Sequence, residues 1–215
     1  MKPQMDDRKT PFVRLYRARF STNAERVALA LAYKGIEAES VWISYDDRSE
    51  VIRLSGQGLV PVIDDDGTVV ADSTRILSYL EECYPDPPLF PTEAARRAQV
   101  DLFIDWFDRN WKRLPNDIER EMNADEPDRD RISALSTEMG AALDRFEAML
   151  SEHDYLMGEF SAADCAAFPF LKYTRARDPE DDELFHQILD EHLQLGENHP
   201  RLAAWIERVD ARPRV

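Results

Sequence analysis

A proline-rich stretch in the middle of the chain constrains the fold more than any other feature. Four prolines fall within residues 85–91, and a proline ring removes a backbone N–H donor and clashes with the preceding helical turn. Before this stretch, short strand-like runs alternate with helices, and after it only helical periodicity occurs. We therefore expect an α/β domain at residues 1–84, a linker at 85–92 and an all-helical domain at 93–215.

The first domain is expected to have the order strand, helix, strand, helix, strand, strand, helix of a thioredoxin-like fold. Short apolar runs predict strands at 12–16, 39–43, 60–63 and 68–71. The last two flank Asp64-Asp65-Asp66-Gly67, which is typical of the turn of an antiparallel hairpin. A helix is predicted between Ser21 and Gly35, a short helical or irregular stretch at 46–54, and a helix after the cap Asp72-Ser73.

The second domain is expected to be a bundle of helices. Apolar stripes predict helices at 94–113, 131–150, 162–173, 183–193 and 201–209. Ser161 and Asp164 have the spacing of a capping box, in which each side chain binds the backbone N–H of the other. Trp106, Phe107 and Trp111 lie at helical spacing and are expected in the core or in an interface.

The acidic composition argues against two classes of partner. Residues with hydrophobic side chains make up 43% of the chain, enough for a core, but the formal net charge is −16. That charge repels phosphate backbones and anionic lipid surfaces. No apolar run reaches the roughly 20 residues that a membrane helix needs. We therefore expect neither nucleic acid nor a membrane as a partner.

The cysteine and histidine content argues against a disulfide framework and a metal centre. Cys83 and Cys165 are the only two cysteines and lie far apart in helical contexts, which fits a protein of the reducing cytoplasm. The four histidines lack the i,i+4 spacing with a carboxylate that marks a metal-binding helix. We expect no metal and treat the histidines as surface residues.

Two short segments of the first domain indicate a binding site. Pro61 opens a strand that is expected to be central, where a missing N–H is unfavourable. In a thioredoxin-like fold a cis Val60-Pro61 bond leaves the Val60 backbone free to pair with an extended peptide ligand. Eleven positions after Pro61, Asp72-Ser73 begins a helix whose amides and dipole attract a carboxylate. Taken singly, the two segments are also compatible with a strand-opening proline and a plain helix cap.

Together these segments resemble the glutathione site of the cytosolic glutathione S-transferase family, which usually has Glu-Ser or Asp-Ser as the second pair. The resemblance extends over nearly the whole chain. Residues 15–16 and 26–36 are similar to the family's first strand and helix, 161–164 to the capping box of its helical domain, and 199–213 to its C-terminal helix. The chain resembles most a bacterial member of the serine-using classes.

The resemblance implies glutathione as a cosubstrate. The residues that it assigns to glutathione binding are Leu59, Val60, Pro61, Asp72 and Ser73. The thiolate would accept a hydrogen bond from Ser21 or Thr22, and the choice stays open because a shift of one residue exchanges their roles. Asn23 falls where some members have a cysteine, and Arg19 lies near the tyrosine of other classes, which argues against disulfide and tyrosine chemistry.

The function implied is conjugation of the glutathione thiolate to a small electrophile by a cytoplasmic homodimer. One alternative is a glutathione-dependent isomerase or dehalogenase with the same thiol site. Another is a non-catalytic binding or scaffold protein, since the fold does not fix the function. Polar residues late on the first helix of the second domain are expected to overhang the active-site cleft, namely Arg113, Asn116 and Arg120.

Overall fold

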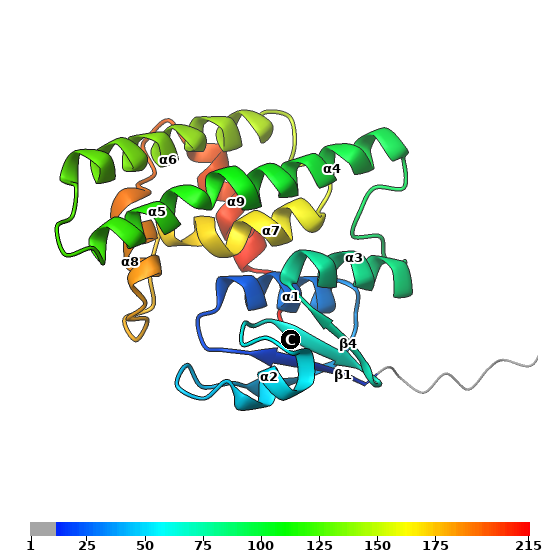
Figure 1. The fold of residues 1–215 in the computed structure, drawn as a ribbon. Helices are drawn as coiled ribbons and strands as arrows, with labels where there is room; N and C mark the ends of the chain where they lie inside the picture. The colour runs from blue at the N-terminus through cyan, green and yellow to red at the C-terminus, as the bar shows by residue number, and fades with distance from the viewer. Residues whose placement is uncertain (1–11) are drawn as a thin grey trace, which may run out of the picture. The chain divides into compact units, whose positions relative to one another are not determined.

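The computed structural model describes residues 12–215, which form two compact units (Figure 1). The first unit contains the chain up to Pro87 together with Pro213–Val215, and the second contains Pro88–Arg212. The first unit is therefore built from two segments that are separated in the chain by the whole of the second unit.

The first unit has the predicted βαβαββα order of a thioredoxin-like fold. Its elements are β1 (Val13–Arg17), α1 (Thr22–Tyr33), β2 (Ala38–Trp42), α2 (Ser49–Ser55), β3 (Val62–Asp65), β4 (Thr68–Ala71) and α3 (Ser73–Cys83). The strands lie side by side in the order β2-β1-β3-β4. β1 and β2 are parallel because α1 crosses over between them, whereas β3 is antiparallel to both β1 and β4.

The sheet of the first unit is covered on both faces. Figure 1 shows α1 and α3 on one face and α2 on the other. Successive side chains of a strand point to opposite faces, so the paired residues Leu15 and Ile63 face α1 and α3 and are fully buried. Tyr16 and Val62, the neighbouring pair, pack with Val51 of α2. Burial on both faces explains why consecutive residues are apolar in the middle of β1 (Leu15-Tyr16) and at the start of β3 (Val62-Ile63).

A buried lysine fastens the end of α1 to the end of α3. The Lys34 Nζ donates to Glu81 Oε2 at 2.8 Å, to the Tyr84 carbonyl at 2.7 Å and to the Pro87 carbonyl at 2.9 Å. Three acceptors match the three protons of an ammonium group, so the cost of burying this charge is offset by hydrogen bonds. The segment that leaves the first unit is thereby tied to its helical layer.

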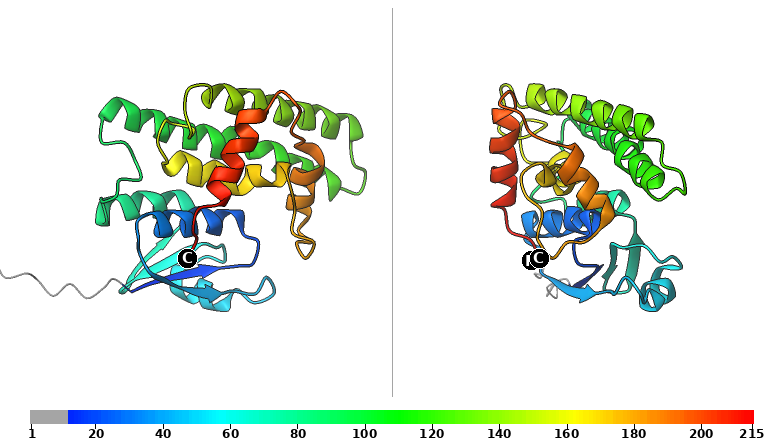
Figure 2. Two further views of the ribbon diagram at one scale, coloured as in Figure 1. Left: turned by 180° about the vertical axis from the view of Figure 1, so that it is seen from behind. Right: turned by 90° about the vertical axis from the view of Figure 1, so that its left-hand side faces the viewer.

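The second unit is a bundle of helices, as predicted. Its elements are α4 (Ala94–Trp106), η1 (Phe107–Trp111), α5 (Arg113–Met122), α6 (Arg129–Met149), α7 (Ala162–Leu171), η2 (Lys172–Thr174), α8 (Leu184–His192) and α9 (Pro200–Asp210). α9 runs steeply across α6 and α7 and contacts both (Figure 2). Within residues 12–215, none of the helices combines the length and the apolar character needed to cross a bilayer.

The first helical stretch of this unit continues to Met122, beyond its predicted end near Arg113. A π-helical turn, η1, joins α4 to α5, and in it the Lys112 N–H donates to the Phe107 carbonyl at 2.9 Å. Because α5 begins again at Arg113, Pro115 falls in a first turn, where its missing N–H costs no intrahelical bond. The apolar period does not reveal such a turn, so the sequence predicts a helix that is too short.

The core of the second unit is aromatic. Phe107 and Trp111 stack with their ring centroids 4.7 Å apart, and Phe107 meets Phe170 edge to face at 5.5 Å. Such pairs add stability beyond the burial of their area. Phe107 and Trp111 are buried, as predicted, and Trp106 is half-buried.

The predicted capping box at the start of α7 is present and has additional partners. The Asp164 Oδ2 accepts from the Ser161 N–H at 2.9 Å, and the Ser161 Oγ accepts from the Ala163 N–H at 3.3 Å. The other carboxylate oxygen, Oδ1, accepts from the Leu156 N–H at 3.0 Å and from Trp205 Nε1 at 2.8 Å. Burial raises the pKa of Asp164 to about 6, although these donors act in the opposite direction.

Two of the four histidines are buried, so the expectation that all lie on the surface is wrong for them. His186 Nδ1 lies 2.9 Å from Asp181 Oδ1, and the Tyr173 hydroxyl donates to Asp181 Oδ2 at 2.8 Å. His199 Nε2 lies 3.0 Å from Asp144 Oδ1. A carboxylate partner for one ring nitrogen lowers the cost of removing a histidine from water.

Candidate functional site

Four connections of the first unit meet at one end of its sheet. Tyr16 of β1 pairs with Val62 of β3, which also pairs with Ala71 of β4, and Arg17 of β1 pairs with Trp42 of β2. This register brings the ends of β1, β2 and β4 and the start of β3 to the same place. The connections found there are residues 18–21, 43–48, 57–61 and 72–73. Side chains that are distant in the sequence can therefore act on one ligand.

The loop after β1 presents two hydroxyls at a helix N-terminus. Phe20 has a left-handed backbone with φ of 64°, and Ser21 follows as the N-cap of α1. The Ser21 Oγ accepts from the Ala24 N–H at 3.3 Å, and a hydroxyl that accepts such a bond still has its proton to donate. Ser21 is half-buried, whereas Thr22 is only 5% exposed. Ser21 is thus the more accessible of the two hydroxyls.

The segment before β3 has a fixed backbone and an exposed side chain. The Val60–Pro61 peptide bond is cis, as the sequence predicts. The Gln57 side-chain oxygen accepts from the Leu59 N–H, and the Gln57 Nε2 donates to the Leu59 carbonyl at 2.9 Å. Leu59 is 77% exposed, Val60 is half-buried and Pro61 is buried. Gln57 therefore holds the backbone at the point where the chain turns into β3.

The start of α3 combines a hydroxyl, a carboxylate and a buried cation. Asp72 is the N-cap and accepts from the Arg75 N–H at 3.0 Å. Ser73 is buried, and the Arg26 guanidinium donates from Nη1 to its Oγ at 3.5 Å. Arg26 belongs to α1 and is fully buried. The N-termini of α1 and α3 lie at the same end of the sheet as this guanidinium, so the local field favours an anion.

The loop after β2 contributes two residues that sequence reasoning missed. The Tyr45 hydroxyl donates to the Arg19 carbonyl at 2.7 Å, and the Arg48 guanidinium lies 4.7 Å from the centre of the Tyr45 ring. Both residues lie in an irregular segment, where no hydrophobic period identifies the positions that make contacts. Gln57 was missed for the same reason, although its place between two glycines was a signal of a tightly built turn.

The second segment of the first unit lies against β1 and α1. The Arg17 Nη1 donates to the Val215 carbonyl at 2.7 Å, and the Arg214 Nε donates to Glu25 Oε1 at 3.1 Å. The Arg17 guanidinium also stacks on the Trp42 ring at 4.8 Å. Burial lowers the pKa of Arg17 and Glu25 raises it, but a guanidinium stays protonated at neutral pH.

Both units match known protein families. Residues 15–88 match the family described as Glutathione S-transferase, N-terminal domain, and residues 129–208 match Glutathione S-transferase, C-terminal domain. The chain belongs to the glutathione S-transferase family. The two matches follow each other in the chain, and residues 89–128, which contain α4, η1 and α5, lie between them.

Relatives of this chain include proteins from animals and bacteria. Glutathione transferase omega-1 of Caenorhabditis elegans is 37% identical over 93 residues, which cover 43% of this chain and 37% of that protein. Protein LigF of Sphingobium sp. is 24% identical over 243 residues, which cover 94% and 91%. A glutathione S-transferase of Methylobacterium radiotolerans, solved in complex with glutathione sulfonate, has 26% identity and a TM-score of 0.73 and covers 94% of this chain and 92% of that one.

The residues expected to form the glutathione site all lie at the end of the sheet where the four connections meet. These residues are Ser21, Thr22, Leu59, Val60, Pro61, Asp72 and Ser73. The register of the strands brings their three loops together. Their roles toward glutathione stay predictions.

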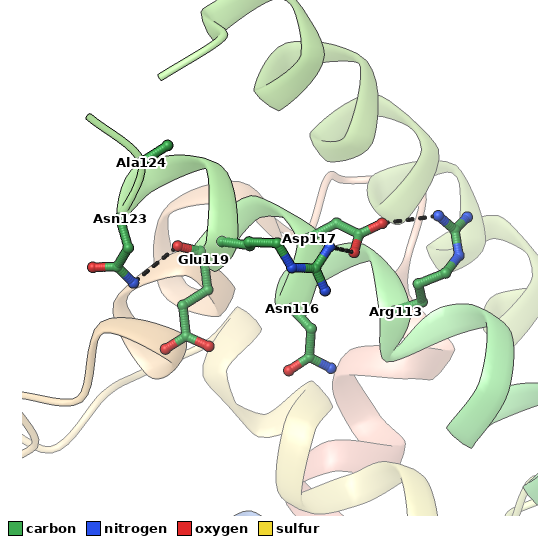
Figure 3. A pocket seen from close by; sticks show the side chains of 7 residues that line it. Arg113, Asn116, Asp117, Glu119, Asn123 and Ala124 are labelled. Carbon is green, nitrogen blue, oxygen red and sulfur yellow. Dashed lines mark hydrogen bonds and ion pairs between the residues drawn. The ribbon is translucent and has the colours of Figure 1, made fainter. Parts of the chain in front are cut away.

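The helical unit of this chain has a polar hollow of about 860 Å³ on α5 (Figure 3). Side chains that line it are Arg113, Asn116, Asp117, Glu119, Arg120 and Asn123. Asp117 is buried and accepts from Arg113 Nη1 at 3.0 Å and from Arg120 Nη1 at 2.7 Å, which holds the two guanidiniums in place. Burial raises the pKa of Glu119. Arg113, Asn116 and Arg120 thus line one surface.

Proposed function

We propose that this protein is a glutathione transferase that joins the thiolate of bound glutathione to a small electrophile. The thiol loses its proton, the sulfur attacks an electrophilic carbon and forms a C–S bond, and the leaving group departs with the electron pair of its broken bond. One observation carries the proposal. In a chain of this family, the N-termini of α1 and α3 and the segment around Val60 lie together at one end of the sheet.

Each group of glutathione has a matching group at this end of the sheet. The Val60 backbone suits the peptide part, the Asp72 carboxylate suits the ammonium group, and Ser73 with the first amides of α3 suits the neighbouring carboxylate. Arg48 offers a cation for the second carboxylate, because its Nη1 is buried and has no hydrogen-bond partner among residues 12–215. The glutathione sulfonate bound to the Methylobacterium relative supports this choice of ligand.

Ser21 is the better candidate for the residue that stabilises the thiolate. Its oxygen caps α1 by accepting a bond, while its proton is available to donate to sulfur. Capping and thiolate binding therefore do not compete. Thr22 is buried in the first turn of α1, where a ligand has less access to it. The dipole of α1 lowers the pKa of a thiol bound at this position further.

The test is the pH dependence of conjugation with 1-chloro-2,4-dinitrobenzene. Ser21→Ala should raise the apparent pKa of the bound thiol and lower turnover at neutral pH, with a smaller loss at high pH, where the thiol ionises unaided. Thr22→Ala is the matched control, because it removes a neighbouring hydroxyl from the same turn. It should leave the midpoint of the profile unchanged.

Thermal unfolding of both variants separates activation from helix capping. Loss of the cap in Ser21→Ala should lower the free energy of unfolding by about 0.5 to 2 kcal/mol. This loss cannot by itself move the midpoint of the pH profile of conjugation. If the midpoint of the pH profile moves in Thr22→Ala alone, Thr22 is the residue that donates a hydrogen bond to the thiolate. If it moves in neither variant, either backbone amides activate the thiol or the protein is not a transferase.

The similarity to LigF suggests a second class of substrate for the assay, in which the leaving group is an aryloxide. Its crystal structure is named that of a beta-etherase, and a thiolate that attacks carbon can expel an aryloxide as well as a halide. A β-aryl ether should therefore be assayed beside the aryl halide. Turnover of the ether that depends on Ser21 would make ether cleavage the preferred activity.

We also infer that the protein acts as a homodimer in the cytoplasm. Leu102 on α4 is 70% exposed, and Trp106, one turn further along the same helix face, is only half-buried. An apolar strip of this kind on the helical unit is suited to burial against a second copy. Neither Cys83 nor Cys165 forms a disulfide, which fits a reducing compartment.

A further inference from the structure

A hydrogen bond joins the loop after β2 to the loop after β1. The Tyr45 hydroxyl donates to the Arg19 carbonyl at 2.7 Å. The Tyr45 ring carries the Arg48 guanidinium at 4.7 Å, within the range of a cation–π contact. Because Arg48 is the residue from which α2 begins, this contact links the ring to a regular element.

The bonded carbonyl belongs to a peptide group that directly affects Ser21. A peptide unit is planar, so holding the Arg19 oxygen fixes the orientation of the whole Arg19–Phe20 peptide. Phe20 then has φ of 64°, a conformation that residues other than glycine rarely adopt unless neighbouring contacts impose it. The Arg19 guanidinium also stacks on the Phe20 ring at 4.6 Å. Ser21 follows at once, so the direction of its hydroxyl depends on this turn.

We propose that Tyr45 is a positioning residue for thiol activation. By holding the Arg19 carbonyl, its hydroxyl keeps the turn at Phe20 in the form that aims the Ser21 hydroxyl at the bound thiol. The inference rests on the function proposed above for Ser21, and Tyr45 acts only through that residue. An ordinary loop contact would stabilise the first unit without affecting the pKa of the thiol, so the two roles predict different results.

Tyr45→Phe tests the inference, because it removes the hydroxyl and keeps the ring against Arg48. We expect turnover at neutral pH to fall about three- to tenfold, the range for losing one hydrogen bond. The thiolate absorbance of bound glutathione, titrated against pH, should show a midpoint higher by about half a unit to one unit. The KM for glutathione should change less than about twofold, because the start of α3 is untouched and phenylalanine keeps the ring against Arg48.

Tyr84→Phe is the matched control. Its hydroxyl also makes a 2.7 Å hydrogen bond within the first unit, to Asp65 Oδ2, but Asp65 lies at the opposite end of β3. This variant should lower stability and leave the thiolate midpoint unchanged. The positioning role would be overturned if Tyr45→Phe had the thiolate midpoint of wild type, or if Tyr84→Phe shifted that midpoint equally. Neither result would contradict the proposed function. If the wild-type protein itself does not lower the pKa of bound glutathione, the proposed function fails and the role of Tyr45 fails with it.

Discussion

Ser73 gives the most direct test, at the level of a single residue, of the proposed glutathione site. If its hydroxyl binds the ligand carboxylate, Ser73→Ala should weaken glutathione binding by about 1 to 3 kcal/mol, the range for losing a hydrogen bond to a charged group. Titration calorimetry on the intact protein measures this change.

Ser78→Ala provides the control on the same helix. Ser78 is half-buried in α3, and its hydroxyl donates to the Thr74 carbonyl at 3.2 Å, so its loss perturbs the helix away from the N-terminus. Glutathione affinity should be unchanged in this variant. Equal affinities for Ser73→Ala and wild type, with the fold intact, would mean that the ligand head group binds elsewhere.

The placement of some residues of the candidate site was predictable from the sequence and that of others was not, for a physical reason. Asp72 and Ser73 have a local signature, because capping is chemistry between a side chain and its own turn. Arg26 had none as a ligand-site residue: it sits in an apolar helical run, and its partner Ser73 is 47 positions away. Tyr45 likewise acts on a carbonyl 26 positions away. Contacts that depend on the tertiary fold leave no mark on the local pattern.

The capping box of α7 predicts how the stability of the protein changes with pH, including the direction of the change. The pKa of Asp164 is about 6 in the folded protein and near 3.9 in an unfolded chain. The folded state binds the proton of Asp164 more tightly than the unfolded chain does. The protonated Asp164 therefore makes its full contribution to the free energy of unfolding below about pH 4, and this contribution is lost as the pH rises through about 6. The stability advantage of wild type over Asp164→Asn should therefore shrink by up to about 3 kcal/mol between these limits.

Urea unfolding at several pH values between those limits measures the effect. Asp128→Asn is the control for the loss of a capping carboxylate, because Asp128 caps α6 from an exposed position by accepting from the Arg131 N–H. A stability difference between wild type and Asp164→Asn that does not vary with pH would contradict the prediction.

Helices and strands with a clear period of apolar residues were predictable from the sequence, and departures from that period were not. The strands and α1 fall within one or two residues of the predicted ranges, because apolar spacing and caps fix them locally. The π-helical turn η1 adds a residue to one turn of a long helix without changing its composition. No pattern of apolar residues distinguishes that from an ordinary turn, so the length of the first helical stretch could not be predicted.

At the level of the whole molecule, the proposed homodimer is most easily checked by its mass in solution. Sedimentation velocity at micromolar concentration should give about twice the chain mass of 24.9 kDa. Leu102→Glu places a charge on the exposed apolar strip of α4 and should shift the protein to the monomer. A wild-type protein that sediments near 24.9 kDa would rule the dimer out.

The division of the first unit into two segments has a consequence for synthesis on the ribosome. When the chain has been made as far as Pro87, all the strands of the sheet exist, but the carbonyl that Arg17 binds and the guanidinium that Glu25 binds do not. They appear only after the entire helical unit has been translated. β1 and α1, which flank the loop of residues 18–21, thus acquire these contacts only once both units have been made. In a nascent chain interrupted within the helical unit, the proposed glutathione site lacks those contacts.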